Sequence, residues 1–344
     1  MLLPATGERV VRLASQPAFR LIAPFLKPVM GLLEDESVSE VMINSNSVYI
    51  ERAGLLEPVK GMVPDALGVR RAAIAIARGL GDDVSDRRPL LDARLPDGSR
   101  IAAALPPCSF GGPVLTIRKF SRRRLSLNDL QHLGSLSEGV ARVIRDAVAC
   151  RRNILVSGGT GSGKTTLLAA IAALIPEDER VIVIEDTVEL PLRNPNLVRF
   201  AARRATEEAP AVTVRHLVRA SLRHRPDRIV VGEVRGGEAW DLLQALNTGH
   251  DGSLSTLHAN SAYNALKRCA SCVLQSGVGL PYAAVQDLLG DVIDLVLHLE
   301  RRAGHRRVRE ALAVYCFDPA SRSWVCETVA GDEGGAVFGQ GAFE

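Results

Sequence analysis

A glycine-rich stretch near the middle of the chain most limits what this sequence can fold into. Residues 158–165 read Gly-Gly-Thr-Gly-Ser-Gly-Lys-Thr, which fits the P-loop pattern of Gly, four residues and Gly-Lys-Thr. The short apolar run before it, 153–157, predicts a buried strand. The run after it, 166–175, is rich in helix formers and stops at Pro176. The glycines therefore lie where a strand turns into a helix.

This turn predicts a site for ATP and Mg²⁺. Glycines allow positive φ, so backbone N–H groups can turn inward around an anion, and the helix N-terminus adds partial positive charge. Lys164 would reach the β- and γ-phosphates, and the Thr165 hydroxyl would hold Mg²⁺. A dinucleotide-binding turn is excluded, because the glycine spacing differs and Lys-Thr opens the helix. The predicted nucleotide-binding residues are Gly158, Gly159, Thr160, Gly161, Ser162, Gly163, Lys164, Thr165 and Thr166.

Composition narrows the class of protein. The chain has 344 residues, which suggests two domains, and it is 47% hydrophobic, enough for sizeable cores. A formal charge of +3 and only 4% aromatic residues give no strong nucleic-acid signal. No apolar run approaches the roughly 18 residues that span a bilayer, and the N-terminus lacks the features of a signal peptide. We expect a cytoplasmic protein without a transmembrane segment, whose membrane contact is peripheral.

The six cysteines are scattered, as expected for reduced thiols in the cytosol. Cys269 and Cys272 form a C-x-x-C pair inside a predicted helix, with no second pair to complete a metal site. Packing in a core is the preferred interpretation, and zinc binding or redox chemistry is the alternative.

The pattern of residues predicts five segments. They are an N-terminal helical segment (1–34), an α+β domain (35–120), a linker (121–135), a P-loop domain (136–330) and a disordered tail (331–344). Within the α+β domain we expect two strands in 38–50, strands at 55–59, 91–95, 100–105 and 113–120, and a helix at 66–80. Asp97-Gly98 predicts a hairpin turn. Arg122, Arg123 and Arg124 open the linker, where they are interpreted as solvated or, less favourably, as facing phosphate.

The P-loop domain alternates strands with helices, which predicts a parallel sheet covered on both faces. Strands are expected at 153–157, 180–184, 228–231 and 253–257, and helices at 138–150, 166–175, 212–223, 237–247 and 261–276. Three further strand-like runs, 294–300, 307–316 and 324–329, suggest a terminal hairpin or small sheet. The fold class is therefore α/β, with an N-terminal α+β domain followed by a P-loop domain.

In the chain, a strand ending at Glu185-Asp186 intervenes between the P-loop strand and the strand ending at Glu233. This order is similar to that of RecA-like ATPases and unlike that of nucleoside kinases. Ligands of such sheets bind beyond the carboxyl ends of the strands. Glu233 is therefore predicted to orient the attacking water or Mg²⁺, although a strand-end carboxylate alone can be a surface residue.

Other polar residues near these strand ends are weaker candidates. Glu185 is the second predicted carboxylate, for Mg²⁺ or for the water, and Asp186 is weaker. The predicted Mg²⁺ ligands are therefore Thr165, Glu185 and Glu233. His250 and His258 lie at the two ends of a predicted strand, as a sensor of the γ-phosphate would, although a lone strand-end histidine is more often structural.

Longer stretches resemble the type II/type IV secretion ATPases. The resemblance includes the P-loop, an acidic box at 184–189 (Ile-Glu-Asp-Thr-Val-Glu), the Gly-Glu within 217–236, and a histidine box at 247–260. Residues 92–100 and 115–120 resemble the VirB11-like branch. Among subgroups the sequence is most similar to the CpaF/TadA ATPases of Flp (tight-adherence) pili, and next to the conjugative TrbB ATPases. The resemblance covers about residues 35–315.

The resemblance implies a homo-hexameric ring whose ATP-driven motion powers pilus assembly or substrate transfer, together with platform proteins of the inner membrane. It also implies that arginines of the N-terminal domain approach the phosphates, which points to Arg94, Arg100 and especially Arg118. Such cations would offset charge that Lys164 cannot cover. The alternatives are a nucleic-acid translocase, which the mild charge disfavours, and a scaffold with negligible turnover, which Glu185 and Glu233 disfavour.

Overall fold

The computed structural model describes residues 23–331 except 53, 96–97, 121–123, 204, 206–208 and 303. It separates into two compact units, Met1–Ser121 and Arg122–Glu344, called here the N-terminal and C-terminal units. Four expectations lie wholly or partly outside the described residues. They are the start of the N-terminal helical segment, the turn at 97–98, the arginines at 122 and 123, and the tail beyond residue 331.

The N-terminal unit is built on a six-stranded sheet with the order β3-β2-β1-β6-β5-β4, in which all neighbours are antiparallel. The predicted strands are all present, and the β4–β5 pairing confirms the predicted hairpin. The strands are β1 (Val38–Asn44), β2 (Ser47–Arg52), β3 (Leu55–Pro58), β4 (Leu90–Arg94), β5 (Arg100–Ala104) and β6 (Val114–Arg118).

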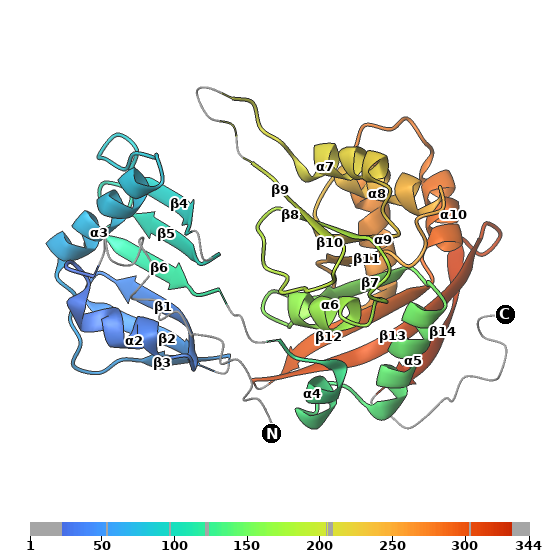
Figure 1. Ribbon diagram of the computed structural model, residues 1–344, viewed down its shortest axis with the longest axis horizontal. Coiled ribbons are helices and arrows are strands. Elements are labelled where there is room, and N and C mark those ends of the chain that lie inside the picture. Colours follow the sequence, from blue (N-terminus) through green and yellow to red (C-terminus); the bar gives the residue numbers. More distant parts are fainter. Residues whose placement is uncertain are drawn as a thin grey trace, which may run out of the picture. The chain divides into compact units, whose positions relative to one another are not determined.

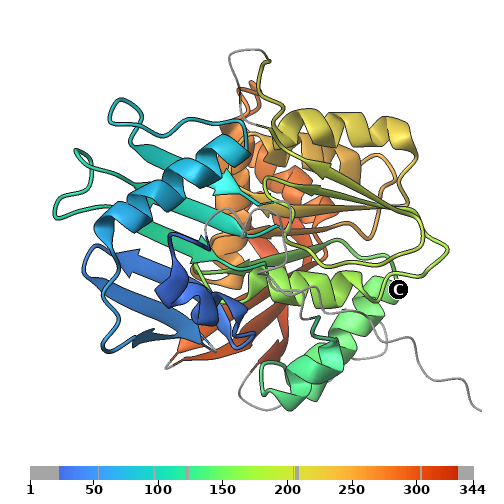
Figure 2. The same ribbon diagram turned by 60° about the vertical axis from the view of Figure 1, so that its left-hand side comes forward.

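Helices pack on this antiparallel sheet (Figure 2). Helix α3 (Ala66–Gly79) begins at Asp65, whose carboxylate accepts hydrogen bonds from the backbone N–H groups of Leu67 and Gly68. A short 3₁₀ turn, η2 (Lys27–Val29), leads into α2 (Met30–Glu34), and its apolar side chains are buried in the same core. The described part of the N-terminal helical segment is therefore part of this unit and not a separate element.

The C-terminal unit contains an eight-stranded sheet with the order β14-β13-β12-β7-β11-β10-β8-β9. Its parallel part runs from β12 to β9 and confirms the predicted parallel sheet. Strand β11 lies between the P-loop strand β7 and β10, so three segments far apart in sequence meet there. The strands are β7 (Ile154–Gly158), β8 (Val181–Glu185), β9 (Leu197–Ala201), β10 (Arg228–Val234), β11 (Leu254–Leu257), β12 (Leu295–Arg302), β13 (His305–Asp318) and β14 (Ser323–Gly331).

The three C-terminal strands do not form a separate small sheet but belong to the main sheet. Strand β12 pairs in parallel with β7, in the register Leu295 with Ile154 through Leu299 with Gly158. Strands β13 and β14 then extend the main sheet as antiparallel neighbours. The physical reason is that the first five residues of β12 are all buried, which is typical of an interior strand of a parallel sheet.

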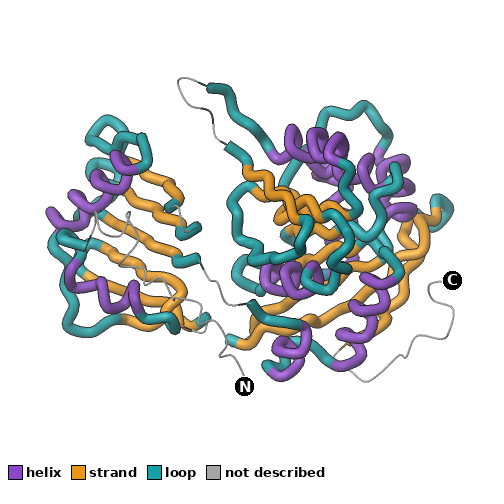
Figure 3. The backbone as a smooth tube through the Cα atoms, viewed as in Figure 1, coloured by secondary structure: helices purple, strands orange, loops and turns teal. Residues whose placement is uncertain are grey.

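Helices cover both faces of this sheet, as predicted (Figures 1 and 3). Helices α4, α5 and α6 share one buried core with the sheet, whereas α7, α8, α9 and α10 share the other. The helices are α4 (Leu127–His132), α5 (Glu138–Ala149), α6 (Lys164–Ala172), α7 (Val214–Ser221), α8 (Glu238–Leu246), α9 (Ala262–Leu274) and α10 (Tyr282–Val292), with a 3₁₀ turn η3 (Leu222–His224).

Three elements were not predicted from the sequence. Strand β9 forms the edge of the sheet, and α10 precedes β12. Helix α4 lies inside the stretch expected to be a linker, and it buries Leu127 and Leu130 in the core of the C-terminal unit. Ser126 begins this helix with a capping box in which Asp129 is the partner.

Candidate nucleotide-binding site

The P-loop has the backbone that its sequence predicts. Strand β7 ends at Gly158, and α6 begins at Lys164. Gly158, Gly161 and Gly163 all have positive φ, with values of 152°, 70° and 100°. A Cβ on Gly158 would lie 2.5 Å from the carbonyl oxygen of Leu299, so the close approach of β12 also requires glycine there.

Lys164 is folded into this loop. Its Nζ donates hydrogen bonds to the carbonyl oxygens of Gly158, at 3.1 Å, and Gly159, at 2.9 Å. The residue is 8% exposed, and burial lowers the pKa of its ammonium group, while the nearby carboxylate of Glu233 raises it. A phosphate oxygen is a stronger partner for this cation than two neutral carbonyls. The amine is therefore placed to exchange loop carbonyls for phosphate.

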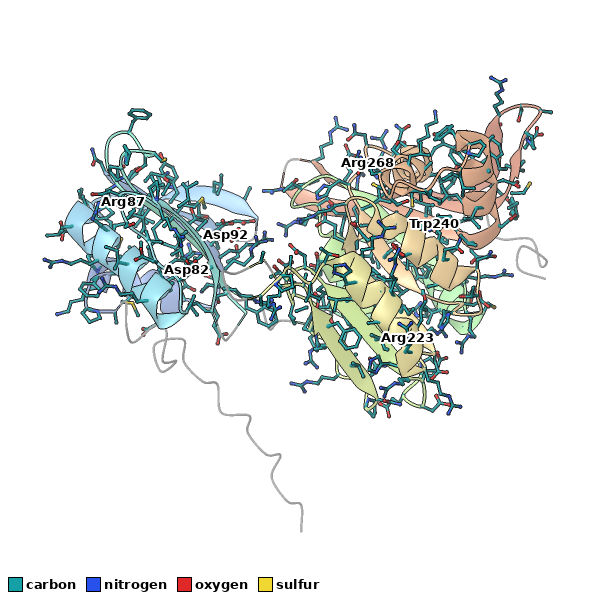
Figure 4. The ribbon with its side chains drawn as sticks, turned by 90° about the horizontal axis from the view of Figure 1, so that it is seen from above. Asp82, Arg87, Asp92, Arg223, Trp240 and Arg268 are labelled. Carbon is teal, nitrogen blue, oxygen red and sulfur yellow. The ribbon has the colours of Figure 1, made fainter. Side chains whose placement is uncertain are left out.

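A cavity of about 400 Å³ opens beside the P-loop. Its lining comes from the loop, from the carboxyl end of β11 and from helix α9: Gly158, Gly159, Thr160, His258, Ala259, Asn260, Asn264 and Arg268. Arg268, which Figure 4 labels, adds a cation to the lining. Sequence reasoning missed Asn260, Asn264 and Arg268. Helical spacing was the available signal, because residues 264 and 268 are one turn apart on a helix that starts directly after the histidine box.

Glu233 and His258 meet next to this cavity. Glu233 Oε1 lies 2.9 Å from His258 Nε2, although the geometry of this contact leaves Oε1 without a hydrogen-bond partner. The other oxygen, Oε2, accepts a hydrogen bond of 2.6 Å from Arg235. His258 Nδ1 lies 3.5 Å from Lys164 Nζ. The structure thus brings three predicted residues, Lys164, Glu233 and His258, into one connected group.

The pKa of His258 is lowered in this group. Burial is the largest cause, and the positive charge of Lys164 is the second, whereas Glu233 acts in the opposite direction. Neutral imidazole is thereby favoured near pH 7, and a neutral ring can both donate and accept a hydrogen bond.

Glu185 is placed differently from Glu233. It is 3% exposed, and its Oε1 accepts hydrogen bonds from the backbone N–H groups of Glu189, at 2.6 Å, and Leu190, at 2.9 Å. Burial raises the pKa of this carboxyl, and the two backbone bonds lower it. Strands β11 and β10 separate its strand β8 from β7. These contacts hold the loop after β8, so a role for Glu185 at Mg²⁺ remains a prediction.

Two other candidates lie away from the cavity lining. His250 precedes β11, at the amino end of the parallel strands. In this region the backbone N–H of Ser253 donates a hydrogen bond to the Asn153 side chain. The ring Nδ1 of His250 lies 3.0 Å from the carbonyl oxygen of Ala245. The structure therefore does not bring His250 to the P-loop. Asp186 is exposed, with Oδ2 at 3.9 Å from Arg235 Nη1.

The residues present fit ATP with Mg²⁺. Ser162 Oγ, Glu185 Oε2 and Glu233 Oε1 are buried and have no hydrogen-bond partner, which is the condition of atoms placed to meet a ligand or a water. Thr165, at the start of α6, is half-buried, and Thr166 is exposed. Mg²⁺ normally takes one or two protein ligands and completes its shell with phosphates and water, so Thr165 and Glu233 suffice.

The three arginines predicted from the N-terminal unit lie together. Arg94 pairs in register with Arg100 across β4 and β5, and Arg100 pairs with Arg118 across β5 and β6. Cross-strand partners point to the same face of a sheet, so the three form one row. Arg118 is exposed at the end of β6, and Arg100 lies 3.7 Å from Asp92.

The C-x-x-C pair is buried in a hydrophobic core. Cys269 and Cys272 both lie on α9 and pack in the core shared with α7, α8 and α10. Burial raises the pKa of Cys269 to about 12, which keeps it an unreactive thiol. Across the described ranges, no group of three or more His, Cys, Asp or Glu side chains could hold a metal ion. The geometry supports the packing interpretation.

Comparison with known proteins gives a consistent result. The family model described as type II/IV secretion system protein matches residues 25–323. A putative conjugal transfer protein of Mycobacterium tuberculosis is 40% identical over 288 residues, covering 81% of both chains. The conjugal transfer protein TrbB of Rhizobium radiobacter is 38% identical, covering 82% of this chain and 85% of its own. The type IV secretion system protein VirB11 of Brucella suis is 36% identical, covering 86% and 90%.

Solved structures share the fold. The ATPase DotB of Legionella pneumophila superimposes with a TM-score of 0.61 at 21% identity, covering 86% of this chain and 82% of its own. The pilus retraction motor PilT, solved with ADP, gives 0.56 at 19% identity, covering 84% and 81%. At these identities the likeness establishes the α/β architecture.

Proposed function

The chain belongs to the type II/IV secretion ATPase family, and from this premise we propose that it hydrolyses ATP with Mg²⁺ to drive a secretion or pilus-assembly machine. The observation that carries the proposal is the meeting of Lys164, Glu233 and His258 beside the P-loop. A phosphate-binding loop alone would fit a binding protein. A carboxylate held 2.9 Å from a histidine at the same cavity adds what hydrolysis needs, a group that orients water.

Each residue has a role in this proposal. The P-loop amides and Lys164 hold the β- and γ-phosphates, and Thr165 holds Mg²⁺. Mg²⁺ neutralises charge that develops on the phosphates in the transition state. Glu233 orients the attacking water, and neutral His258 contacts the γ-phosphate, with Arg268 as a further cation in the cavity. Glu185 is a secondary candidate.

We propose that this machine works at the inner membrane and that platform proteins of that membrane are the partners of the chain. None of the helices that the structure describes is long and apolar enough to cross a membrane. We propose that the protein attaches peripherally to the cytoplasmic side of this membrane. The names of the relatives, conjugal transfer proteins and VirB11, favour a conjugal or type IV secretion machine over the Flp pilus machine expected from the sequence.

The active species is proposed to be a homo-hexameric ring. In a ring, the row Arg94–Arg100–Arg118 can supply cations to phosphates that Lys164 alone does not neutralise. A cation that arrives only on closure would couple the nucleotide state to the movement of the N-terminal unit.

The decisive experiment measures ATP hydrolysis and nucleotide binding of one variant and its control. Lys164→Ala should lose hydrolysis and bind nucleotide weakly, because the phosphates lose their main side-chain partner. Lys267→Ala, which removes the same charge from the exposed face of α9, is the matched control and should keep turnover. Wild-type turnover by Lys164→Ala would contradict the proposed site.

Sedimentation with and without ATP and Mg²⁺ tests the ring. A chain that stays monomeric at micromolar concentration while hydrolysing at full rate would contradict it. Hydrolysis that depends on added DNA, with a steep loss of DNA affinity in salt, would instead favour a nucleic-acid translocase.

A further inference from the structure

The hairpin that joins β12 and β13 contains a dense group of arginines. Residues 300–310, called here the arginine hairpin, contain five arginines and two glutamates. Their formal charge of +3 equals that of the whole chain. Arg309 lies 3.3 Å from Glu300, which offsets part of this charge. A cationic hairpin at this position calls for an explanation, because β12 runs directly beside the P-loop strand.

Two of these arginines face the P-loop. Arg301 and Arg306 are cross-strand partners, so their side chains lie on the same face of the hairpin. Arg306 Nε donates a hydrogen bond of 2.9 Å to the carbonyl oxygen of Gly161. A Cβ on Gly161 would lie 3.3 Å from Arg301 Nη1. By the alternation of strand side chains, Arg302 points to the opposite face.

The order of strands shows which half of a nucleotide this face meets. Strand β7 lies between β11 and β12. His258 follows β11, and Glu233 lies on the next strand, β10, so the γ-phosphate must lie on the β11 side of the P-loop. A nucleoside triphosphate is linear, with the γ-phosphate at one end and the nucleoside at the other. Its nucleoside half therefore leaves the P-loop on the β12 side, past the arginine hairpin.

We propose that Arg301 and Arg306 contact the ribose and base of the bound nucleotide. Guanidinium groups stack on planar rings and donate hydrogen bonds in a fixed fork, which suits a base and the ribose hydroxyls. Arg306 is also tied to the P-loop carbonyl at Gly161, so its position depends on the shape of that loop. This inference rests on the proposed binding of ATP at the P-loop and adds the part of the site that distinguishes a nucleotide from inorganic polyphosphate.

The test uses the full chain and two ligands, ATP and inorganic triphosphate, both with Mg²⁺. Inorganic triphosphate occupies the phosphate-binding loop but has no ribose or base. Arg301→Ala should weaken ATP binding by about 10- to 100-fold, the size of a lost charge-assisted contact, and leave the affinity for inorganic triphosphate unchanged. Arg306→Ala should likewise weaken ATP binding and leave the affinity for inorganic triphosphate unchanged. Arg302→Ala removes the same charge from the opposite face and should change neither affinity.

Three outcomes of Arg301→Ala are distinct. A selective loss of ATP affinity supports the inference, and intact triphosphate binding shows at once that the variant is folded. An equal loss for both ligands overturns it, because the arginine then acts on the phosphates or on the shape of the loop. Unchanged ATP affinity also overturns it. If the wild-type chain itself binds neither ligand, the proposed function fails instead.

Discussion

Glu233 and His258 come from neighbouring parallel strands, and their side chains meet with Oε1 of the glutamate 2.9 Å from Nε2 of the histidine. Arg235 binds the other carboxylate oxygen at 2.6 Å. Arg235 thus holds one carboxylate oxygen, while Oε1 keeps the capacity to accept a hydrogen bond from a water. A glutamate that merely lay on the surface at a strand end would lack these contacts, so the arrangement distinguishes Glu233 from such a residue.

Glu233→Gln should bind ATP and Mg²⁺ but hydrolyse ATP slowly. The amide keeps the size of the carboxylate and loses its charge, so the water is no longer polarised. Loss of such a group typically costs roughly 10²–10⁴-fold in rate. Single-turnover hydrolysis and nucleotide affinity, measured on the same preparation, check both parts. Normal hydrolysis by this variant would move the water-orienting role elsewhere.

Glu185→Ala should lower stability. Two backbone amides, of Glu189 and Leu190, lose their acceptor, and each buried amide left unsatisfied costs about 1–3 kcal/mol. We expect the free energy of unfolding to fall by about 2–4 kcal/mol, read from urea titration. Asp186→Ala, at the exposed neighbour, is the control and should change it by less than about 0.5 kcal/mol.

A Glu185→Ala variant that lost activity without losing stability would contradict this structural role. If Glu185→Ala keeps its stability and Mg²⁺-dependent hydrolysis is lost, Glu185 acts at the metal as the sequence predicted.

The pH profile should reflect the lowered pKa of His258. A lowered pKa means that the ring stays neutral at and below its ordinary value of roughly 6.5 and becomes charged only at more acidic pH. The kcat/KM for ATP should therefore hold from pH 8 to roughly 6.5 and fall as the pH drops through the lowered pKa. His258→Asn should lack this component of the acid fall. A decline of the wild type already between pH 8 and 7 would mean that the pKa is raised.

Arg118→Ala should keep its fold and much of its nucleotide affinity and lose most hydrolysis. An arginine that stabilises the transferring phosphoryl group supplies about 10³–10⁵ in rate. Mixing Arg118→Ala with Lys164→Ala subunits tells where the arginine acts. Partial recovery of hydrolysis means that a neighbouring subunit supplies it, and no recovery means that it acts within its own chain. Full hydrolysis by Arg118→Ala alone would exclude the role.

The sequence predicted the parts of the site that depend on local chemistry. Glycine spacing, an apolar run before it and helix formers after it are enough to predict the turn from β7 into α6. The approach of Glu233 to His258 was predicted more loosely, from strand ends that share one edge of a sheet. The order of strands in the sheet could not be predicted in the same way, because the pairing of β12 with β7 joins residues 141 positions apart.

The features that the sequence did not predict were missed for different reasons. Strand β9 is only half-buried at a sheet edge, so its sequence has a weak pattern. The arginines at 301 and 306 are far from the P-loop in sequence, and only the pairing of β12 with β7 brings them to it. Their density within residues 300–310 was the one available signal.

The contact between Gly158 and Leu299 has a consequence for synthesis of the chain. The ribosome completes the P-loop long before it makes β12, which supplies one wall of that loop at residues 295–299. Domains of this size fold largely after such distant segments have emerged. The growing chain therefore cannot form the P-loop together with this wall until β12 has been made.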